Sequence, residues 1–135
     1  MKYLVILFFS LFLTSDSVAQ QVAYLNGQLQ EVKKREAEFI RELTEFSPGK
    51  FTARVTDTEG RLKFEGVYIL EEGKLYEQGE FIFYYPNGKV ESRGMYEYGV
   101  KTGTWERYDN FGNRKADKYY NPESAALIRA AMKKK

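Results

Sequence analysis

The chain has 135 residues and a formal net charge of +2, with 21 Lys and Arg residues against 19 Asp and Glu. It contains neither histidine nor cysteine, which excludes His-ligated zinc, Ser-His-Asp and Cys-His catalysis, and disulfide bonds. The basic residues are mixed with acidic ones and form no basic stripe, so we expect no nucleic-acid partner.

The first 19 residues are expected to be a secretory signal peptide. The segment 3–13 is almost continuously apolar, and Ser17-Val18-Ala19 offers small residues where a signal peptidase reads them. The alternative, a retained membrane anchor, is disfavoured because the apolar run is shorter than the roughly 20 residues that span a bilayer. We therefore expect cleavage after Ala19 and an exported protein, periplasmic or at the cell surface, with no membrane insertion afterwards.

The segment 20–56 contains one clear strand and one ambiguous stretch. Val22–Leu25 is β-prone and ends at Asn26-Gly27, a strong turn dipeptide. In the segment 28–46, apolar residues three and four apart are typical of an amphipathic helix. Yet the segment 37–44 also alternates and precedes the turn Pro48-Gly49, which favours a strand. The helical spacing is that of Leu29, Val32, Phe39, Leu43 and Phe46.

From Phe51 onward the signals are those of strands joined by tight turns. Alternating or aromatic runs are separated by glycine-containing turns such as Pro86-Asn87-Gly88. Strands are expected at 51–56, 62–70, 81–85, 90–98, 104–108 and 114–120.

Two of these hairpins repeat each other at an offset of 24 residues. The matched pairs are Gly79 and Gly103, Phe81 and Trp105, Tyr84 and Tyr108, Gly88 and Gly112, and Tyr96 and Tyr120. A third, degenerate copy precedes them, with Ala53 at the position of Phe81 and about four extra residues expected in a 70–78 loop. A fixed period of this size indicates an array of supersecondary units, which present surfaces more often than catalytic centres.

The chain is expected to end in a short helix over 121–135. Asn121 can cap it, Pro122 suits its first turn, and Lys133–Lys135 suit its negative end.

The repeat pattern also resembles a known family. The sequence carries G-x-[WF]-x-x-Y-x-x-x-G followed by Y-x-x-G at Gly79 to Gly99, and from Gly103 it repeats this pattern as far as the second tyrosine, Tyr120. This resembles the MORN-repeat variant of exported bacterial proteins labelled as YwqK-type antitoxins. The resemblance implies an antiparallel β-hairpin array over 57–120, with a meander over 20–56 leading into it, and it favours a strand at 37–44. It implies no established activity.

The aromatic residues form the one candidate site. We expect a binding face made by Tyr84, Tyr96, Tyr98 and Tyr108, because tyrosine supplies contact area at a low entropic cost. The alternative is that most of the tyrosines fill the core of a single-layer sheet. Since Phe81 and Tyr84 are three residues apart, they should lie on opposite faces of their strand unless a bulge intervenes.

The leading functional hypothesis is a non-enzymatic, exported module that binds a protein partner. One alternative is an antitoxin-like or immunity-like inhibitor of a toxic partner. The other is a carbohydrate-active enzyme that uses carboxylates alone, and it requires two carboxylates in a cleft. We assign no catalytic, cofactor or metal residue, and expect Asp57-Thr58-Glu59-Gly60 to be a turn rather than a calcium loop. The acidic candidates for the enzyme are Asp57, Glu59, Glu71, Glu72, Glu80 and Glu91.

Overall fold

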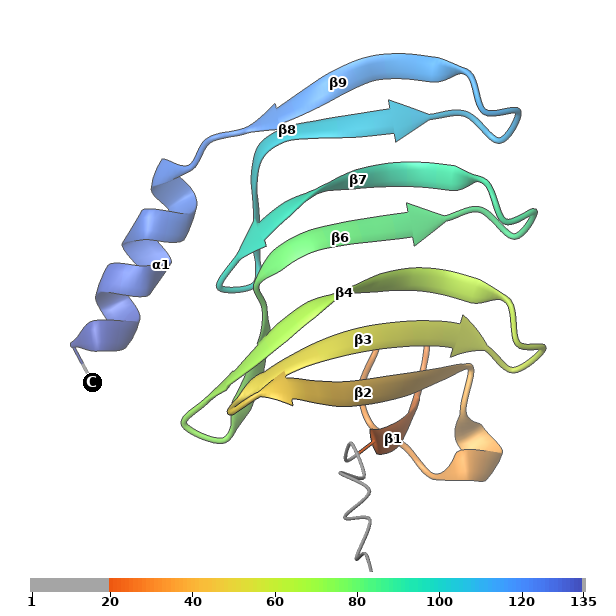
Figure 1. Ribbon diagram of the computed structural model, residues 1–135, viewed down its shortest axis with the longest axis horizontal. Coiled ribbons are helices and arrows are strands. Elements are labelled where there is room, and N and C mark those ends of the chain that lie inside the picture. The colour runs from red at the N-terminus through yellow and green to blue at the C-terminus, as the bar shows by residue number, and fades with distance from the viewer. Residues whose placement is uncertain (1–19, 135) are drawn as a thin grey trace, which may run out of the picture.

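The computed structural model describes residues 20–134, so the predicted signal peptide and Lys135 lie outside the described residues. The described part is one antiparallel sheet of nine strands followed by a single α-helix (Figure 1). The strands are β1 Gln20–Leu25, β2 Phe39–Ser47, β3 Lys50–Asp57, β4 Leu62–Glu71, β5 Lys74–Glu77, β6 Gly79–Tyr84, β7 Val90–Glu97, β8 Val100–Tyr108 and β9 Arg114–Tyr120. The helix α1 is Glu123–Lys133, and a single 3₁₀ turn, η1, covers Lys34–Glu36.

The strands follow one another across the sheet as a meander, from β1 to β4 and then from β6 to β9, while β5 pairs with β4. This confirms the predicted fold class. The sequence left helix and strand open for 28–46, and the strand favoured at 37–44 is confirmed, because β2 pairs with β1 over residues 39–44 and with β3 over residues 39–47. The apolar residues with helical spacing belong to separate elements: Leu29 lies in a turn, whereas Phe39 and Leu43 lie in β2.

The turns at one end of the sheet share one geometry. After β3, β6 and β8, a backbone N–H donates to the carbonyl four residues on, and a glycine donates back to the first residue of the turn. Those glycines, Gly60, Gly88 and Gly112, have φ of +84°, +85° and +90°, a conformation that side chains disfavour. The turn after β1 makes the same bonds, with Leu29 at φ +61° in place of glycine.

The turns at the other end are tighter. Glu72-Gly73 and Tyr98-Gly99 each join two strands through two residues that both have positive φ, as in type I′ turns. The sequence predicted a loop for the extra residues of the third copy, and this prediction is wrong. These residues extend β4 and add β5, which makes an ordered hairpin.

The core lies on one side of the sheet, which we call the aromatic face, defined by Phe64, Phe81, Phe83, Tyr96 and Trp105. Phe81 and Trp105 are each 1% exposed. Each ring lies against a glycine of a neighbouring strand, Gly66 of β4 for Phe81 and Gly94 of β7 for Trp105. A Cβ built on Gly66 would come within 2.5 Å of the Phe81 ring, and one built on Gly94 within 2.4 Å of the Trp105 ring. The two glycines thus make room for the two rings.

Among the described residues no second layer of strands or helices covers the aromatic face. Its rings are buried by packing against one another. Tyr96 packs edge-on between Phe81 and Trp105, with ring-centre distances of 4.8 and 5.3 Å. Tyr120 extends the series, with its ring centre 6.2 Å from that of Trp105. Edge-to-face contacts of this kind stabilise aromatic clusters beyond the area that they bury.

The helix α1 leaves the end of β9 and lies beside the ends of the strands (Figure 1). Pro122 occupies the N-cap position, and the side-chain oxygen of Asn121 accepts the N–H of Glu123 at 3.0 Å. Ala125 is fully buried and anchors the helix, whereas Leu127 is 72% exposed. Within residues 20–134, no helix has the length and the apolar character that crossing a membrane requires.

Candidate functional site

The structure does not bring the four candidate tyrosines together. Tyr96 is packed between Phe81 and Trp105 on the aromatic face. Tyr84 and Tyr108 lie on the opposite face, and Tyr98 lies in the turn between β7 and β8. The single tyrosine face expected from the sequence is therefore corrected to three separate locations. A contribution of each tyrosine to binding stays a prediction.

The glycines and aromatics assigned to the repeat itself do occupy repeated structural positions. Phe81 and Trp105 are the most deeply buried rings among the described residues, and Tyr120 packs against Trp105 as Tyr96 packs against Phe81. The assigned glycines have positive φ, which explains why residues with side chains are disfavoured there. They are Gly79, Gly88, Gly99, Gly103 and Gly112.

The face opposite the aromatic one carries compensated charges, and we call it the ion-pair face, defined by Arg54, Glu65, Arg93 and Glu106. Arg54 pairs in register with Glu65, and Arg93 with Glu106 on the neighbouring strand. The Nε of Arg93 lies 2.6 Å from Oε2 of Glu106. The Arg93 guanidinium holds the pKa of Glu106 below its usual value. Cross-strand pairs of opposite charge stabilise a sheet modestly.

Tyr84 and Tyr108 belong to this ion-pair network. The Tyr84 hydroxyl donates to Oε1 of Glu65 at 2.7 Å, and the Tyr108 hydroxyl donates to Oε2 of Glu106 at 3.2 Å. Desolvation, the main cause, and the hydrogen bond to the Glu65 carboxylate, the second cause, raise the pKa of Tyr84 to about 12. The separation of three residues thus placed Phe81 and Tyr84 on opposite faces, as expected from the sequence.

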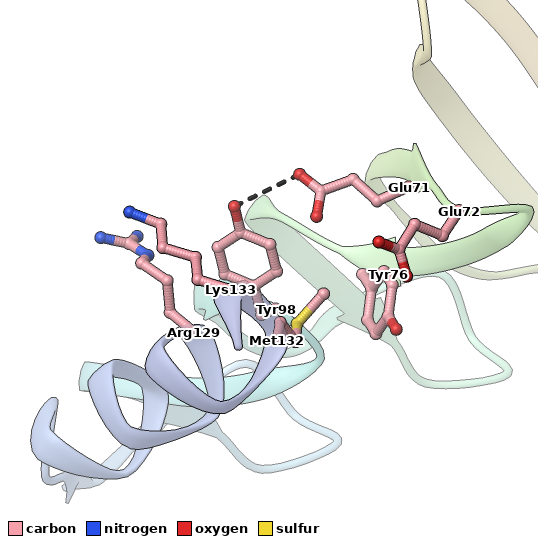
Figure 2. Close-up of a pocket in the computed structure, with 7 residues that line it drawn as sticks. All are labelled: Glu71, Glu72, Tyr76, Tyr98, Arg129, Met132 and Lys133. Atoms are coloured by element: carbon pink, nitrogen blue, oxygen red, sulfur yellow. Dashed lines mark hydrogen bonds between the residues drawn. The ribbon is translucent and has the colours of Figure 1, made fainter. Parts of the chain in front are cut away.

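Tyr98 lies at a cavity of about 340 Å³ between α1 and the β4–β5 hairpin. Figure 2 shows Arg129 of the helix on one side of the Tyr98 ring and Glu71 on the other, with Met132 of the helix lying toward Tyr76. The Tyr98 hydroxyl donates to Oε1 of Glu71 at 3.3 Å, and burial raises its pKa. Arg129 forms an ion pair with Glu97 and stacks 5.3 Å from the Tyr98 ring centre. These contacts fasten α1 to the sheet.

A second group of side chains lies at the β8–β9 end of the aromatic face. Lys101, Arg107 and Lys115 line a cavity of about 140 Å³ together with Trp105 and other residues. Lys118 lies on the same face, because it pairs in register with Trp105 and its Nζ is 5.0 Å from the Tyr120 ring centre. We call Lys101, Arg107, Lys115 and Lys118 the cation cluster.

The cation cluster has little compensating charge. Within residues 20–134, none of its four side chains has a carboxylate oxygen within 4.0 Å, and Glu91 is the one acidic residue lining the cavity. Lys101 instead lies over the Trp105 ring, with its Nζ 4.5 Å from the centre, which is a favourable cation–π contact. Arg107 and Lys115 stand directly opposite each other across β8 and β9. Like charges in that position destabilise a sheet.

A β-bulge creates this opposition. The register of β8 with β9 shifts between Trp105 and Arg107, so the four residues of β9 from Lys115 to Lys118 oppose the three of β8 from Trp105 to Arg107. Both lysines therefore reach the aromatic face although they are an odd number of residues apart. Bulges re-aim side chains in this way at many functional sites.

The repeat itself shows that the cluster is particular to the last copy. At the positions 24 residues earlier, the chain has Glu77 for Lys101, Phe83 for Arg107, Glu91 for Lys115 and Gly94 for Lys118. Two acidic and two uncharged residues have thus been replaced by four cations. The four cations are not contiguous in the sequence and form no basic stripe there, so the expectation of no basic patch did not reveal the cluster. Comparing charge between the aligned copies is the signal that finds it.

The acidic candidates are dispersed over several elements. Glu71 and Glu72 line the cavity beside α1, while Oδ1 of Asp57 accepts the N–H groups of Glu59 and Arg61 inside a turn. The turn prediction for Asp57 to Gly60 is therefore confirmed. In the part of the chain described, no three Asp or Glu side chains are grouped so that they could hold a metal ion.

A scan against protein-family models and searches of curated proteins and of solved structures found no match for this chain.

Proposed function

We propose that this chain is an exported, non-enzymatic repeat module that binds a protein partner at the β8–β9 end of its sheet. The export rests on the apolar leader ending at Ala19, and the repeat character rests on the offset of 24 residues. The observation that carries the binding proposal is the cation cluster, in which Arg107 opposes Lys115 and neither has a carboxylate oxygen within 4.0 Å among the described residues.

An unfavourable like-charge pair is retained where it serves function at the expense of stability. A bound partner that supplies negative charge would convert this repulsion into attraction. The cluster stands on paired strands, which hold side chains in place more accurately than loops do. Lys101 and Arg107 are also half-buried beside aromatic rings. Arginine and aromatic residues are enriched among the residues that contribute most to binding energy at protein interfaces.

The test is affinity capture from the exported fraction after chemical crosslinking. The bait is the wild-type protein, and the comparison is the double variant Arg107→Gln/Lys115→Gln. The matched control is Lys33→Gln/Lys50→Gln, which removes one exposed cation just before η1 and another at the start of β3. We expect one protein to be captured by the wild type and the control but lost with the cluster variant. Equal capture by all three baits would refute a role for this face.

An inhibitor of a toxic partner would make the same kind of protein contact. The two roles differ in what the captured protein does, so toxicity of that protein when expressed alone, and its relief by this chain, would indicate the inhibitor.

A further inference from the structure

We propose that the segment bound at the β8–β9 end is an extended acidic peptide that adds to the sheet as a further strand beside β9. This inference rests on the proposed function and specifies the chemistry of the partner. It is carried by three observations: an open strand edge, a cation cluster beside it, and a change of residue at one repeat position.

The edge of β9 is open. β9 is the last strand of the sheet, and all of its residues except Tyr120 are exposed. In Figure 1 no strand lies beyond it, and α1 lies beside the strand ends instead of along β9. The opposite edge, β1, is partly covered, since Leu25 bridges to Glu31 and Val32 donates its N–H to the carbonyl of Tyr24. Unpaired N–H and C=O groups along an edge are a template for strand addition.

The cation cluster determines the charge of the added strand. Side chains of an added strand alternate between the two faces, so every second residue would lie on the aromatic face near Lys115 and Lys118. Carboxylates at those alternate positions would approach cations that form no ion pair among the described residues. The interior strand β8 contributes Lys101 and Arg107 to the same face.

The repeat position of Lys118 indicates which kind of side chain of the added strand would contact it. At Gly66 and Gly94, glycine accommodates an aromatic ring from the next strand of the array. Lys118 occupies the position of Gly94 one period later and stands beside the open edge. A lysine leaves no space for a ring but can bind a carboxylate, so the residue of the partner strand that faces Lys118 is expected to be acidic.

Protection of the edge against aggregation explains only part of the cluster. Lysines on edge strands do prevent unwanted pairing, which would account for Lys115 and Lys118. It does not account for Lys101 and Arg107, because β8 is paired on both sides. An anionic membrane is a poorer fit, since Lys101 and Arg107 are half-buried in a cavity and a flat surface could not reach both.

The probe is the peptide acetyl-Thr-Glu-Val-Glu-Thr-Glu-Val-Thr-amide, titrated into the full chain. Trp105 is the only tryptophan of the protein and lies under Lys101, so its fluorescence reports on the site. We expect a saturable change in fluorescence and an affinity that falls as the salt concentration rises. Binding should be about tenfold weaker to Arg107→Gln/Lys115→Gln and to Lys118→Gly. Binding to Lys33→Gln/Lys50→Gln should be unchanged. Hydrogen exchange at the amides of β9 should slow when the peptide is bound.

Several results would overturn the inference. They are binding of a peptide with Gln in place of every Glu, equal binding of a peptide with its three Glu residues adjacent, and binding to phosphatidylglycerol vesicles but not to the peptide. Neutralising the cluster removes repulsion, so the Arg107→Gln/Lys115→Gln variant should melt no lower than the wild type. If crosslinking capture still depends on the cluster while the peptide fails, the strand-addition inference is wrong and the proposed function stands.

Discussion

Replacement of Gly94 by alanine tests the physical basis of the repeat. Gly94 lies in β7 with an ordinary strand conformation, since its φ is not positive. Alanine is normally favoured over glycine inside a strand by about 0.5–1 kcal/mol. Here the added Cβ would lie 2.4 to 2.5 Å from three atoms of the Trp105 ring, whereas unstrained carbon contacts are about 3.5–4.0 Å. The ring would have to move by roughly 1 Å.

The Trp105 ring has nowhere to move without disturbing its neighbours. It is 1% exposed and packs against Tyr96, Tyr120 and Phe83. Overpacking of a core usually destabilises by about 1–3 kcal/mol, and we expect Gly94→Ala to lower the free energy of unfolding by about 2–3 kcal/mol. The sign is therefore opposite to the intrinsic preference of the strand.

The assay is urea unfolding followed by circular dichroism, which also works for variants without tryptophan. The control is the same substitution in a Trp105→Leu background, where no ring lies over position 94. There Gly94→Ala should be neutral or stabilising, so the two substitutions should couple strongly in a double-mutant cycle. If Gly94→Ala stabilises the wild-type protein, or if the two effects simply add, the explanation of the glycine positions is refuted.

Three further predictions concern the turns and the tyrosines. Leu29→Gly should raise the free energy of unfolding by about 0.5–1 kcal/mol, because Leu29 has φ +61° where the equivalent turns have glycine; a loss of stability in urea unfolding would contradict this. Backbone N–H groups bonded to Asp57 and Asp109 hold both pKa values below 3.8, so their contribution to stability is complete above about pH 4 and is lost as the pH falls through the lowered values. Asp109→Ala should therefore destabilise the protein at pH 7, whereas Asp109→Asn should retain the turn and reduce the acid sensitivity measured by thermal melts. Burial raises the pKa of Tyr96 to about 12 from 10.0, so the folded state should lose stability as the pH rises from about 10 to 12, and Tyr96→Phe should shift alkaline unfolding to higher pH.

Much of the fold could be predicted because its local signals agree. In β3, Phe51, Ala53 and Val55 alternate with polar residues and are buried, and the turn glycines recur where positive φ is required. In the segment 28–46 the helical spacing is misleading, because its apolar residues belong to different elements. Leu29 lies in a turn, Val32 lies in the segment bonded to β1, and the later ones lie in β2. The strand β5 was missed because four residues that pair with only one neighbour carry little pattern of their own.

The candidate site was harder to predict because it depends on register. Alternation along one strand correctly placed Phe81 and Tyr84 on opposite faces. No local pattern, however, shows which residues of β7 lie on the same face of the sheet as Phe81. The cation cluster depends on a bulge that brings Lys115 opposite Arg107, and bulges have no reliable sequence signal of their own. The comparison of aligned repeat copies carries that information indirectly, since it shows four cations where the preceding copy has none.

Site-specific photocrosslinking can detect whether a partner binds at the β8–β9 end of the sheet. A photoreactive amino acid is placed at Ala116 on the exposed strand β9 and, for comparison, at the exposed Thr52 on β3. We expect a crosslinked product from position 116 that disappears in the Arg107→Gln/Lys115→Gln background, and none from position 52. A product from position 52 alone, or a product from position 116 that persists in that background, would contradict it.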